Sequence, residues 1–424
     1  MSVEARDDRF GDRSCSVAQT LGWSESSELR GFLVATVIVM ARREPHRGRP
    51  HVIVVAHSVD PADGGMETVH ARLIAELLDE VDFTVVSCRL DPSLKGRVEW
   101  RRIRVPIRPA TARFPLFFIV ASVVVARARR SGWLVHTCGA IIGNRVDVAT
   151  VHTTGAAVVA ARGGRLAPAG APFFRRLNSG ALRWMALRAE RWSYRPDRCA
   201  MLAPVSDVTG DELRQFYPGV PITVTPNGVD TERFQPSLAT RDEVRAELGV
   251  GEAPMVMFVG GDFDRKGLGV AIEALTHAPS VVLVVAGPGD LERATRLAED
   301  LGVADRLRLL GRRSDVERLD QAADLYCCAS LYEADSLALL EAAACGLPLV
   351  STRVGSAAQV IGEGEAAAGV LVERTPEALG QALERLAGDV SLRASMGSVA
   401  LERAATRRWD VLALGVLDLY RSRS

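Results

Sequence analysis

The hydrophobic positions of this chain gather in short continuous runs, and many of these runs are separated by longer stretches with helical spacing of apolar residues. In the first half, helical patterns occur near residues 66–80, 114–128 and 179–194. Strands that alternate with helices are typical of βαβ units and parallel sheets. Six runs in this half predict strands, at 51–56, 83–88, 102–105, 133–136, 148–152 and 200–206.

The second half repeats the arrangement. Its runs predict six further strands, at 255–260, 280–287, 306–311, 324–330, 347–352 and 369–372. Because these strands are continuous runs rather than alternations, helices should cover both faces of each sheet. We therefore predict an α/β fold of two Rossmann-like, doubly wound domains that face a central cleft, with ligands at the carboxyl ends of the strands. The domains should meet at Thr223–Pro236, "TVTPNGVDTERFQP", where Pro, Asn and Gly favour a turn.

Two apolar stretches are too short to span a bilayer as helices, "FLVATVIVMA" at 32–41 and "FPLFFIVASVVVA" at 114–126. The first follows a polar lead of about 30 residues that contains acids, and no A-x-A cleavage site follows it. We interpret residues 1–48 as a disordered or weakly structured extension. The second stretch precedes Arg127, Arg129 and Arg130. A buried helix is the favoured interpretation, and a helix at an anionic membrane surface is the alternative.

The composition excludes several classes of function. The 52 basic and 52 acidic residues cancel, so we expect no nucleic acid partner, and any charged ligand must be bound locally. The seven cysteines form no C-x-x-C pair and are odd in number. This pattern favours reduced thiols in a cytoplasmic protein over a disulfide framework or a zinc site.

The loop after the first strand carries Gly64 and Gly65 directly before an amphipathic helix. Paired glycines allow close approach of a ligand, and the N–H groups of the helix point toward it, which would suit an anion. The alternative is a turn that needs glycine only for its geometry. The loop is not G-x-G-x-x-G and no acidic residue stands at the end of the second strand, so a dehydrogenase is disfavoured.

A pair of cations follows the first strand of the second domain. The chain has two lysines against fifty arginines, and one of the two, Lys266, stands beside Arg265 where a helix begins. A compact ammonium next to a planar guanidinium suits a diphosphate, although a solvated surface pair is the alternative. Asp262 and Asp264 form a D-x-D of the kind that can bind a divalent metal, but two cations follow directly, so we interpret it as coincidental.

The stretch "YEADSLALLEAAACGLP", Tyr332–Pro348, contains two glutamates in apolar company. Ser336 predicts an N-cap and Gly346 a left-handed stop, which leaves Glu333 in the preceding loop and Glu341 inside the helix. The N–H groups at the start of such a helix, at Ser336 and Leu337, can bind a phosphate, and a carboxylate one turn further can accept hydrogen bonds from a ribose. The alternative is a helix-dipole carboxylate and a salt-bridge partner.

These motifs together resemble glycosyltransferase family four, the retaining nucleotide-sugar transferases with an E-x7-E signature. Over residues 50–421 the matching stretches are "VTPNGVDTERF", "DFDRKGL", "GPGD", "APVSDVTGDEL", "RWDVLALGVLDLY" and the glutamate pair followed by "AAACGLP". The resemblance implies an acceptor-side domain at 49–222, a donor domain at 223–405 and a C-terminal helix at 406–424 that crosses back to the first domain.

The resemblance also implies roles for individual residues. Lys266 and Arg265 would bind the donor diphosphate together with Gly64, Gly65, Ser336 and Leu337. Glu333 would lie near the donor sugar and Glu341 on the ribose. His152, in "VATVHTTG", would orient or polarise groups around the reacting centre. The sequence departs from the family pattern at three places. Gly261 stands where the family often has Arg, so Arg265 would have to supply that charge. Asp335 and Ser336 stand where Phe or Pro and Gly are common, which puts the loop's contact to the sugar in doubt, and Thr153 follows the histidine where Asp is frequent.

The expected function is therefore sugar transfer with retention, from a nucleotide diphosphosugar to a glycan, lipid or small-molecule acceptor, with no cofactor and no metal. The expected partners are the donor, a glycan or lipid-linked acceptor and, as a peripheral contact, the inner surface of a membrane. A nucleotide-sugar epimerase or a sugar phosphorylase of the same architecture, or a non-catalytic glycan- or nucleotide-binding protein, stays open as the alternative.

Overall fold

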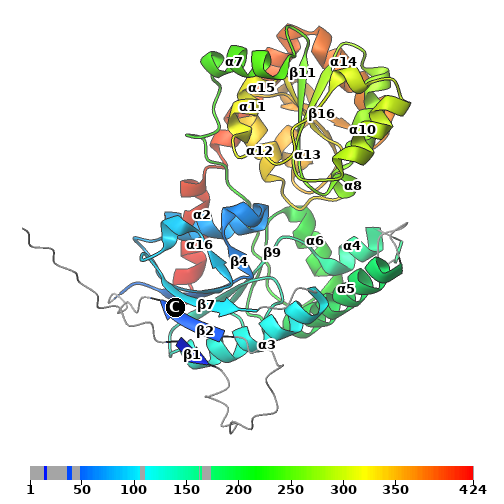
Figure 1. The fold of residues 1–424 in the computed structure, drawn as a ribbon. Helices are drawn as coiled ribbons and strands as arrows, with labels where there is room; N and C mark the ends of the chain where they lie inside the picture. The colour runs from blue at the N-terminus through cyan, green and yellow to red at the C-terminus, as the bar shows by residue number, and fades with distance from the viewer. Residues whose placement is uncertain are drawn as a thin grey trace, which may run out of the picture.

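The computed structural model describes residues 14–16, 36–40, 48–105, 110–161, 163–164 and 173–423, and it folds into two α/β domains. The first domain, blue to green in Figure 1, and the second, green to orange, lie one above the other in that view. The last helix returns from the second domain to the first. The predicted fold class is confirmed.

The first domain is built on an eight-stranded sheet in the order β1-β2-β7-β5-β3-β8-β9-β10. From β7 to β10 all neighbours are parallel, in the doubly wound order of the Rossmann fold. Its strands are β1 (Ser14–Ser16), β2 (Thr36–Met40), β3 (His51–Val55), β5 (Asp82–Ser87), β7 (Glu99–Arg104), β8 (Leu134–Cys138), β9 (Val148–Val151) and β10 (Leu202–Pro204). Two short strands, β4 (Ser58–Val59) and β6 (Arg89–Leu90), pair separately.

The helices of the first domain lie on both faces of this sheet, as predicted from the continuous apolar strands. They are α2 (Gly65–Glu76), α3 (Ala110–Ala128), α4 (Gly155–Ala161), α5 (Phe173–Ser193) and α6 (Asp207–Phe216). In β3, Ile53 and Val55 pack on one side with α3, whereas Val52 and Val54 pack on the other side with α2. Full burial of one such side chain stabilises the fold by about 2 kcal/mol.

The second domain is built on a fully parallel sheet in the order β13-β12-β11-β14-β15-β16, again the doubly wound order. Its strands are β11 (Met255–Val259), β12 (Val282–Ala286), β13 (Leu307–Leu309), β14 (Leu325–Cys328), β15 (Leu349–Thr352) and β16 (Gly369–Val372). The helices from the linker onward are α7 (Leu238–Leu248), α8 (Phe263–Lys266), α9 (Leu268–Ala274), α10 (Leu291–Asp300), α11 (Val316–Ala322), α12 (Leu337–Ala344), α13 (Ala357–Ile361), α14 (Pro376–Gly388), α15 (Val390–Ala405) and α16 (Trp409–Arg421).

The chain crosses between the domains twice, and the two crossings lie side by side. The backbone N–H of Val229, on the way out, donates to the carbonyl of Arg407, on the way back, at 2.7 Å. The returning helix α16 then packs against α2, and the hydroxyl of Tyr420 lies 2.5 Å from Nδ1 of His136 on β8. The C-terminal helix is thus part of the first domain's core.

Two features differ from the sequence analysis. The sequence analysis predicts a disordered or weakly structured extension at residues 1–48, whereas β1 and β2 of this segment extend the first sheet, because β2 pairs antiparallel with β7. The other residues of 1–47 lie outside the described part of the chain. The helix predicted from the run at 114–126 is longer than that run, since α3 begins at Ala110 and continues through Pro115.

The observed length of α3 differs from the expectation that this stretch is too short to span a bilayer. Among the described residues, α3 is the helix that is long and apolar enough to cross a bilayer. One of its faces lies in the core of the first domain, through Phe117, Ala121 and Val125. The buried-helix interpretation therefore holds for that face, while Ile119 is exposed.

Candidate functional site

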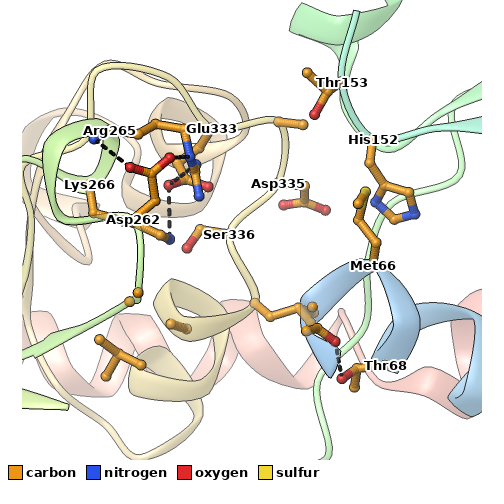
Figure 2. A pocket seen from close by; sticks show the side chains of 18 of the residues that line it. Met66, Thr68, His152, Thr153, Asp262, Arg265, Lys266, Glu333, Asp335 and Ser336 are labelled. Carbon is orange, nitrogen blue, oxygen red and sulfur yellow. Dashed lines mark hydrogen bonds and ion pairs between the residues drawn. The ribbon is translucent and has the colours of Figure 1, made fainter. Parts of the chain in front are cut away.

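A cleft of about 860 Å³ lies between the two domains at the carboxyl ends of both sheets. The first domain contributes the loops after β3 and β9, and the second contributes the loops after β11, β12, β13 and β14. Figure 2 shows Arg265, Lys266 and Glu333 on one side of the cleft and His152 on the other. All nine residues predicted for the site line it, namely Gly64, Gly65, His152, Arg265, Lys266, Glu333, Ser336, Leu337 and Glu341.

The N-terminus of α2 enters the cleft because of its two glycines. Gly64 is the N-cap residue and has φ 154°, a conformation that L side chains rarely adopt. Gly65 lies against the facing domain, where an added Cβ would come 3.4 Å from Leu337. The helix has 12 residues, so its first N–H groups have no partner within the helix and its positive end points to the cleft.

The two predicted cations share one carboxylate. Oε1 of Glu333 accepts from Nη1 of Arg265 at 2.8 Å, and Nζ of Lys266 lies 2.8 Å from the same oxygen. The hydroxyl of Ser330 donates to it as well, at 3.0 Å. Because Asp262 also lies 3.4 Å from Nε of Arg265, the two cations face two carboxylates, and an incoming anion must compete with these carboxylates for the cations.

Both aspartates of the D-x-D are engaged by arginines. The carboxylate of Asp262 caps α8 by accepting from the backbone N–H of Arg265 at 3.3 Å, and it also lies 3.4 Å from Nε of the same residue. Asp264 accepts from Nη1 of Arg293 at 2.9 Å. This pairing supports the interpretation of the D-x-D as structural.

Helix α12 begins and ends where the sequence predicts. Ser336 is its N-cap residue by backbone geometry, although its buried hydroxyl has no hydrogen-bond partner among the described residues. At the other end, Gly346 has φ 76° and its N–H donates to the carbonyl of Ala343. Such a left-handed residue satisfies the last carbonyls of a helix.

Glu341 projects from the second turn of α12 to the cleft wall. Burial raises the pKa of this carboxyl from 4.5 to about 7, while Arg233 opposes the shift and Glu317 adds to it. At neutral pH the side chain therefore exchanges between a form that can donate a hydrogen bond and one that only accepts.

His152 follows β9 and is buried at the cleft wall. Burial, with smaller contributions from His70 and His136, lowers the pKa of its imidazole to about 3. The ring is therefore neutral at physiological pH, so it can orient or accept a proton but does not act as a cation. His136 has a structural part instead, since its nitrogens lie 2.5 Å from the Tyr420 hydroxyl and 2.7 Å from the Thr150 hydroxyl.

Asp335, one of the departures from the family pattern, serves as a structural anchor. Its carboxylate accepts from the backbone N–H of Asn227 at 2.7 Å and from the hydroxyl of Ser356. It also lies 3.4 Å from Nη1 of Arg407. Asp335 thus connects the outgoing crossing of the chain, the loop before α12 and the returning crossing.

Several lining residues were not predicted, among them Met66, Thr68, Arg183, Arg312 and Tyr332. Arg312 follows β13, so the rule that ligands bind at the carboxyl ends of strands would have found it. Tyr332 donates to Glu212 of α6 across the domain interface at 3.0 Å, a contact that no local pattern predicts.

Two family models match the two halves of the chain. "Glycosyltransferase Family 4" matches residues 63–233, and "Glycosyl transferases group 1" matches residues 240–403. Among solved structures, the crystal structure of WaaG, a glycosyltransferase involved in lipopolysaccharide biosynthesis, is similar with a TM-score of 0.72 and 22% identity, covering 87% of this chain and 98% of that one. At this identity the likeness concerns the fold.

Curated relatives agree with these matches. A D-inositol 3-phosphate glycosyltransferase of Xylanimonas cellulosilytica is 32% identical over 71% of this chain and 75% of its own length. A GDP-mannose-dependent alpha-(1-6)-phosphatidylinositol monomannoside mannosyltransferase of Mycolicibacterium smegmatis is 28% identical over 85% of this chain and 94% of its own length. The first relatives matched are aligned over only about half of their length, 51%.

The resemblance carried by the motifs is thus confirmed over both domains. The long alignment with the Xylanimonas protein and the two consecutive family matches agree with the paired doubly wound sheets and the cleft between them. The chain belongs to glycosyltransferase family four.

Proposed function

We propose that the protein transfers a sugar from a nucleotide diphosphosugar, with retention at the anomeric carbon, to a glycan, lipid or small-molecule acceptor. One observation carries the proposal. Arg265 and Lys266 meet the N-termini of α2 and α12 in a single cleft, with Glu333 and Glu341 beside them. Cations and helix N-termini that converge from two domains form an anion site suited to a diphosphate.

The arrangement would act on the leaving group. When the sugar leaves, negative charge grows on the diphosphate, and fixed donors in a closed cleft stabilise it without reorganising. Removing one such donor raises the barrier by about 3 to 4 kcal/mol. Arg265 and Lys266 are held in place by Glu333, so an incoming phosphate competes with that carboxylate for the same two cations.

The acceptor's proton needs a base, and among the described residues that line the cleft no carboxylate pair stands out as suited to a double displacement. We infer a front-face attack in which the departing phosphate oxygen takes the acceptor's proton as the new glycosidic bond forms and the old one breaks. Neutral His152, on the opposite wall, would orient the reacting groups. Closure of the domains would exclude water and favour transfer over hydrolysis.

We also infer that transfer needs no metal and no cofactor. The support is that Asp262 and Asp264, the acidic pair of the D-x-D, already engage Arg265 and Arg293. Two cations supply the charge that a divalent ion supplies elsewhere.

The experiment is a thermal-shift screen of nucleotide diphosphosugars, since a bound donor raises the melting temperature. The similarity to these relatives puts GDP-mannose first among the donors to test, and inositol phosphates and phosphatidylinositol derivatives first among the acceptors. Transfer is then measured with the stabilising donor, and the anomeric configuration of the product by nuclear magnetic resonance.

The same assay separates the rival functions. An epimerase would isomerise the donor without an acceptor, and a phosphorylase would require inorganic phosphate and show no nucleotide preference. A non-catalytic binding protein would be stabilised by the donor and turn nothing over. Any of these three results would replace the proposed function.

We further propose that the protein works in the cytoplasm as a peripheral membrane protein, and that α3 and α5 form the contact surface. The two helices run side by side (Figure 1), joined by a hydrogen bond between Thr111 and Asn178 at 2.8 Å. Ile119 on α3 and Trp184 on α5 are exposed, and the guanidinium of Arg188 lies over the Trp184 ring at 5.4 Å. Exposed apolar side chains with arginines beside them suit an anionic lipid surface.

Vesicle flotation tests this surface with phosphatidylglycerol against phosphatidylcholine. We expect binding to the anionic vesicles, and its loss in the double variant Ile119→Ser, Trp184→Ser. The matched control is Leu238→Ser, an exposed apolar position in the second domain. Equal binding by the double variant and the control would contradict the assignment.

A further inference from the structure

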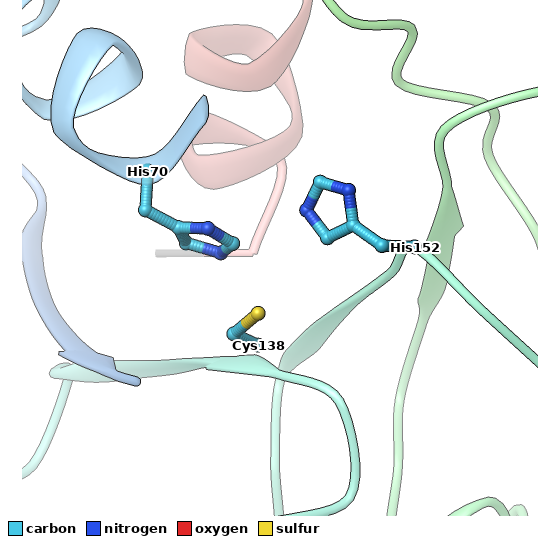
Figure 3. Close-up of side chains that lie close together, drawn as sticks. All are labelled: His70, Cys138 and His152. Atoms are coloured by element: carbon cyan, nitrogen blue, oxygen red, sulfur yellow. The ribbon is translucent and has the colours of Figure 1, made fainter. Parts of the chain in front are cut away.

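Three metal-ligating side chains converge beside the cleft, in a place that sugar transfer does not use as a group. His70 comes from α2, Cys138 ends β8, and His152 follows β9. Figure 3 shows the three side chains turned toward a common centre. One imidazole nitrogen from each histidine and the sulfur of the cysteine all lie within 4.8 Å of one another.

Each of the two histidine rings has one buried nitrogen without a hydrogen-bond partner among the described residues. Nδ1 of His70 lies 2.9 Å from the carbonyl of Met66, which can only accept, so Nδ1 carries the proton and Nε2 holds a lone pair. Nε2 of His70 and Nε2 of His152 are both buried and have no hydrogen-bond partner among the described residues. Buried polar atoms are normally paired, so two unpaired nitrogens at one place call for an explanation.

The neighbouring His136 differs from these two rings. Its ring lies 6.0 Å from that of His70, but both of its nitrogens have partners, the hydroxyls of Tyr420 and Thr150. Both nitrogens of His136 are therefore engaged, whereas His70 and His152, whose ring centroids are 5.6 Å apart, each have a buried Nε2 without a partner among the described residues.

Two neutral imidazoles and a thiol are the donor set that zinc prefers. With zinc–ligand bonds of about 2.0 to 2.3 Å, tetrahedral ligand atoms stand about 3.5 Å apart, so the cluster needs to contract by roughly 1 Å. The bond from His70 Nδ1 to a backbone carbonyl is the support that orients histidine ligands in metal sites. Sulfur is a soft ligand that a thiophilic ion such as Zn²⁺ binds and that Mg²⁺ or Ca²⁺ does not, and binding releases the thiol proton.

We propose that His70, Cys138 and His152 form a site for a thiophilic divalent cation such as Zn²⁺, and that its occupation inhibits the protein. Binding joins the ion to two nitrogens and the thiolate sulfur and releases the thiol proton to solvent. Because His152 also lines the cleft, a bound ion would fix the orientation of its ring beside the reacting groups. The inhibitory half of this inference rests on the proposed function, whereas the binding half does not.

Cobalt titration tests the binding half with the ion alone. In metal-free protein, Co²⁺ bound to a thiolate gives a near-ultraviolet charge-transfer band that we expect to saturate at one equivalent, with Zn²⁺ displacing it. Cys138→Ala should lose the band. The matched control is Cys88→Ala, which removes another half-buried cysteine and should keep the band. A wild-type protein without the band, or a Cys138→Ala variant that keeps it, overturns the site.

A second measurement uses only the wild-type protein, in case a variant does not fold. X-ray absorption at the zinc edge, with one equivalent of Zn²⁺, should show one sulfur at about 2.3 Å and two imidazole nitrogens at about 2.0 Å. A first shell without sulfur overturns the site.

The inhibitory half is tested by the zinc concentration that halves the transfer rate, with each variant normalised to its own metal-free rate. Loss of the sulfur ligand should raise this concentration at least about tenfold in Cys138→Ala, since even weakening a supporting contact costs 10- to 100-fold in affinity. Cys88→Ala should match wild type. Stoichiometric zinc binding with an unchanged transfer rate overturns the inhibitory half. If the protein has no transferase activity, only this rate measurement fails, and the cobalt and X-ray tests of binding remain valid.

Discussion

The ammonium of Lys266 lies 2.8 Å from Oε1 of Glu333, so a cation expected to bind a phosphate is paired with a carboxylate expected to lie by the sugar. Glu333 has side-chain exposure of 10% and Lys266 of 13%, so little water screens this pair. A diphosphate must therefore take over a hydrogen bond that exists before it binds. The contribution of Lys266 to donor affinity is therefore the free energy of its contact with the phosphate minus that of its contact with Glu333.

Replacing Lys266 by alanine should weaken binding of a nucleoside diphosphate about 10- to 100-fold, because a hydrogen bond to a charged group contributes about 1.5 to 3 kcal/mol. Isothermal titration calorimetry measures the dissociation constant. The chain supplies a matched control in Lys95→Ala, since Lys95 is its other lysine, is exposed and is not among the residues that line the cleft. An unchanged dissociation constant in Lys266→Ala would end the assignment.

Substitutions of the two signature glutamates, Glu333 and Glu341, should change different kinetic constants. Glu333→Gln removes the carboxylate that competes with the phosphate, so the nucleoside diphosphate should bind at least as tightly as to wild type while kcat falls about 100-fold. Glu341→Ala should mainly raise KM, about tenfold, with kcat nearly unchanged, because a ribose contact acts equally in ground state and transition state.

Steady-state kinetics with the donor varied at saturating acceptor, alongside circular dichroism, separate the two cases. If both variants fold and show wild-type kinetics, the transfer site lies elsewhere. If both unfold, the pair is a packing feature of the loop and of α12.

Glu341 also predicts a pH dependence of stability. Its folded-state pKa, about 7, lies above its ordinary value of 4.5, so the folded state holds this proton more tightly than the unfolded state. The stabilisation is complete below about pH 4.5 and is lost as the pH rises toward 7. Glu341→Gln keeps the uncharged shape, so it should be more stable than wild type at pH 8, by about 1 to 3 kcal/mol, and equal to it near pH 4.5.

Urea unfolding without ligand at the two pH values measures this difference. The control is Glu363→Gln, where an exposed carboxylate pairs with Arg353 at the surface and a change within about 0.5 kcal/mol is expected at both pH values. A stability gain in Glu341→Gln that is the same at pH 4.5 and pH 8 would show that burial of its charge is not the cause.

Local signals in the sequence predict much of this fold. All twelve apolar runs coincide with strands of the two parallel sheets, and the bounds of α12 follow from Ser336 and Gly346. The reason is that a buried parallel strand and a capped helix are each specified within about ten residues of sequence. The rule that ligands bind at the carboxyl ends of strands, together with the family resemblance, led to nine predicted site residues, and all nine line one cleft.

Contacts between residues that are distant in the sequence could not be predicted from these local signals. The antiparallel addition of β2 to β7 depends on two segments about 60 residues apart that no single hairpin turn joins. The shared carboxylate of Glu333 and the cluster of His70, Cys138 and His152 likewise arise only when separate strand ends meet. Sequence spacing identified the charged groups of the site, and the fold decided which of them pair.

Transfer should survive chelation. Excess EDTA should leave the rate at least as high as in untreated protein, because both aspartates of the D-x-D pair with arginines and Lys266 and Arg265 supply the positive charge. The transfer assay is repeated with and without EDTA, and with Mg²⁺ or Mn²⁺ added back. A loss of activity that either metal restores would contradict metal-independent transfer.

Asp335 provides the last prediction, which concerns stability and the joint between the domains. Its side chain is fully buried and accepts from the backbone of Asn227, while Arg407 lies 3.4 Å away. Burial raises the pKa of this carboxyl, and Arg407 partly offsets the shift. Asp335→Ala would leave the Arg407 charge and the Asn227 N–H without their partner, so it should lower the free energy of unfolding by about 3 to 5 kcal/mol.

The control is an exposed ion pair that begins at the residue after Arg407. Arg408 and Asp410 lie 2.6 Å apart with both side chains 52% exposed, so Asp410→Ala should change the free energy of unfolding by less than about 1 kcal/mol. Urea unfolding of both variants gives the comparison. Because Asp335 joins both crossings of the chain, its loss should also broaden the unfolding transition, since the two domains then unfold with less coupling. Equal losses in the two variants would show that the buried anchor contributes no more than a surface ion pair.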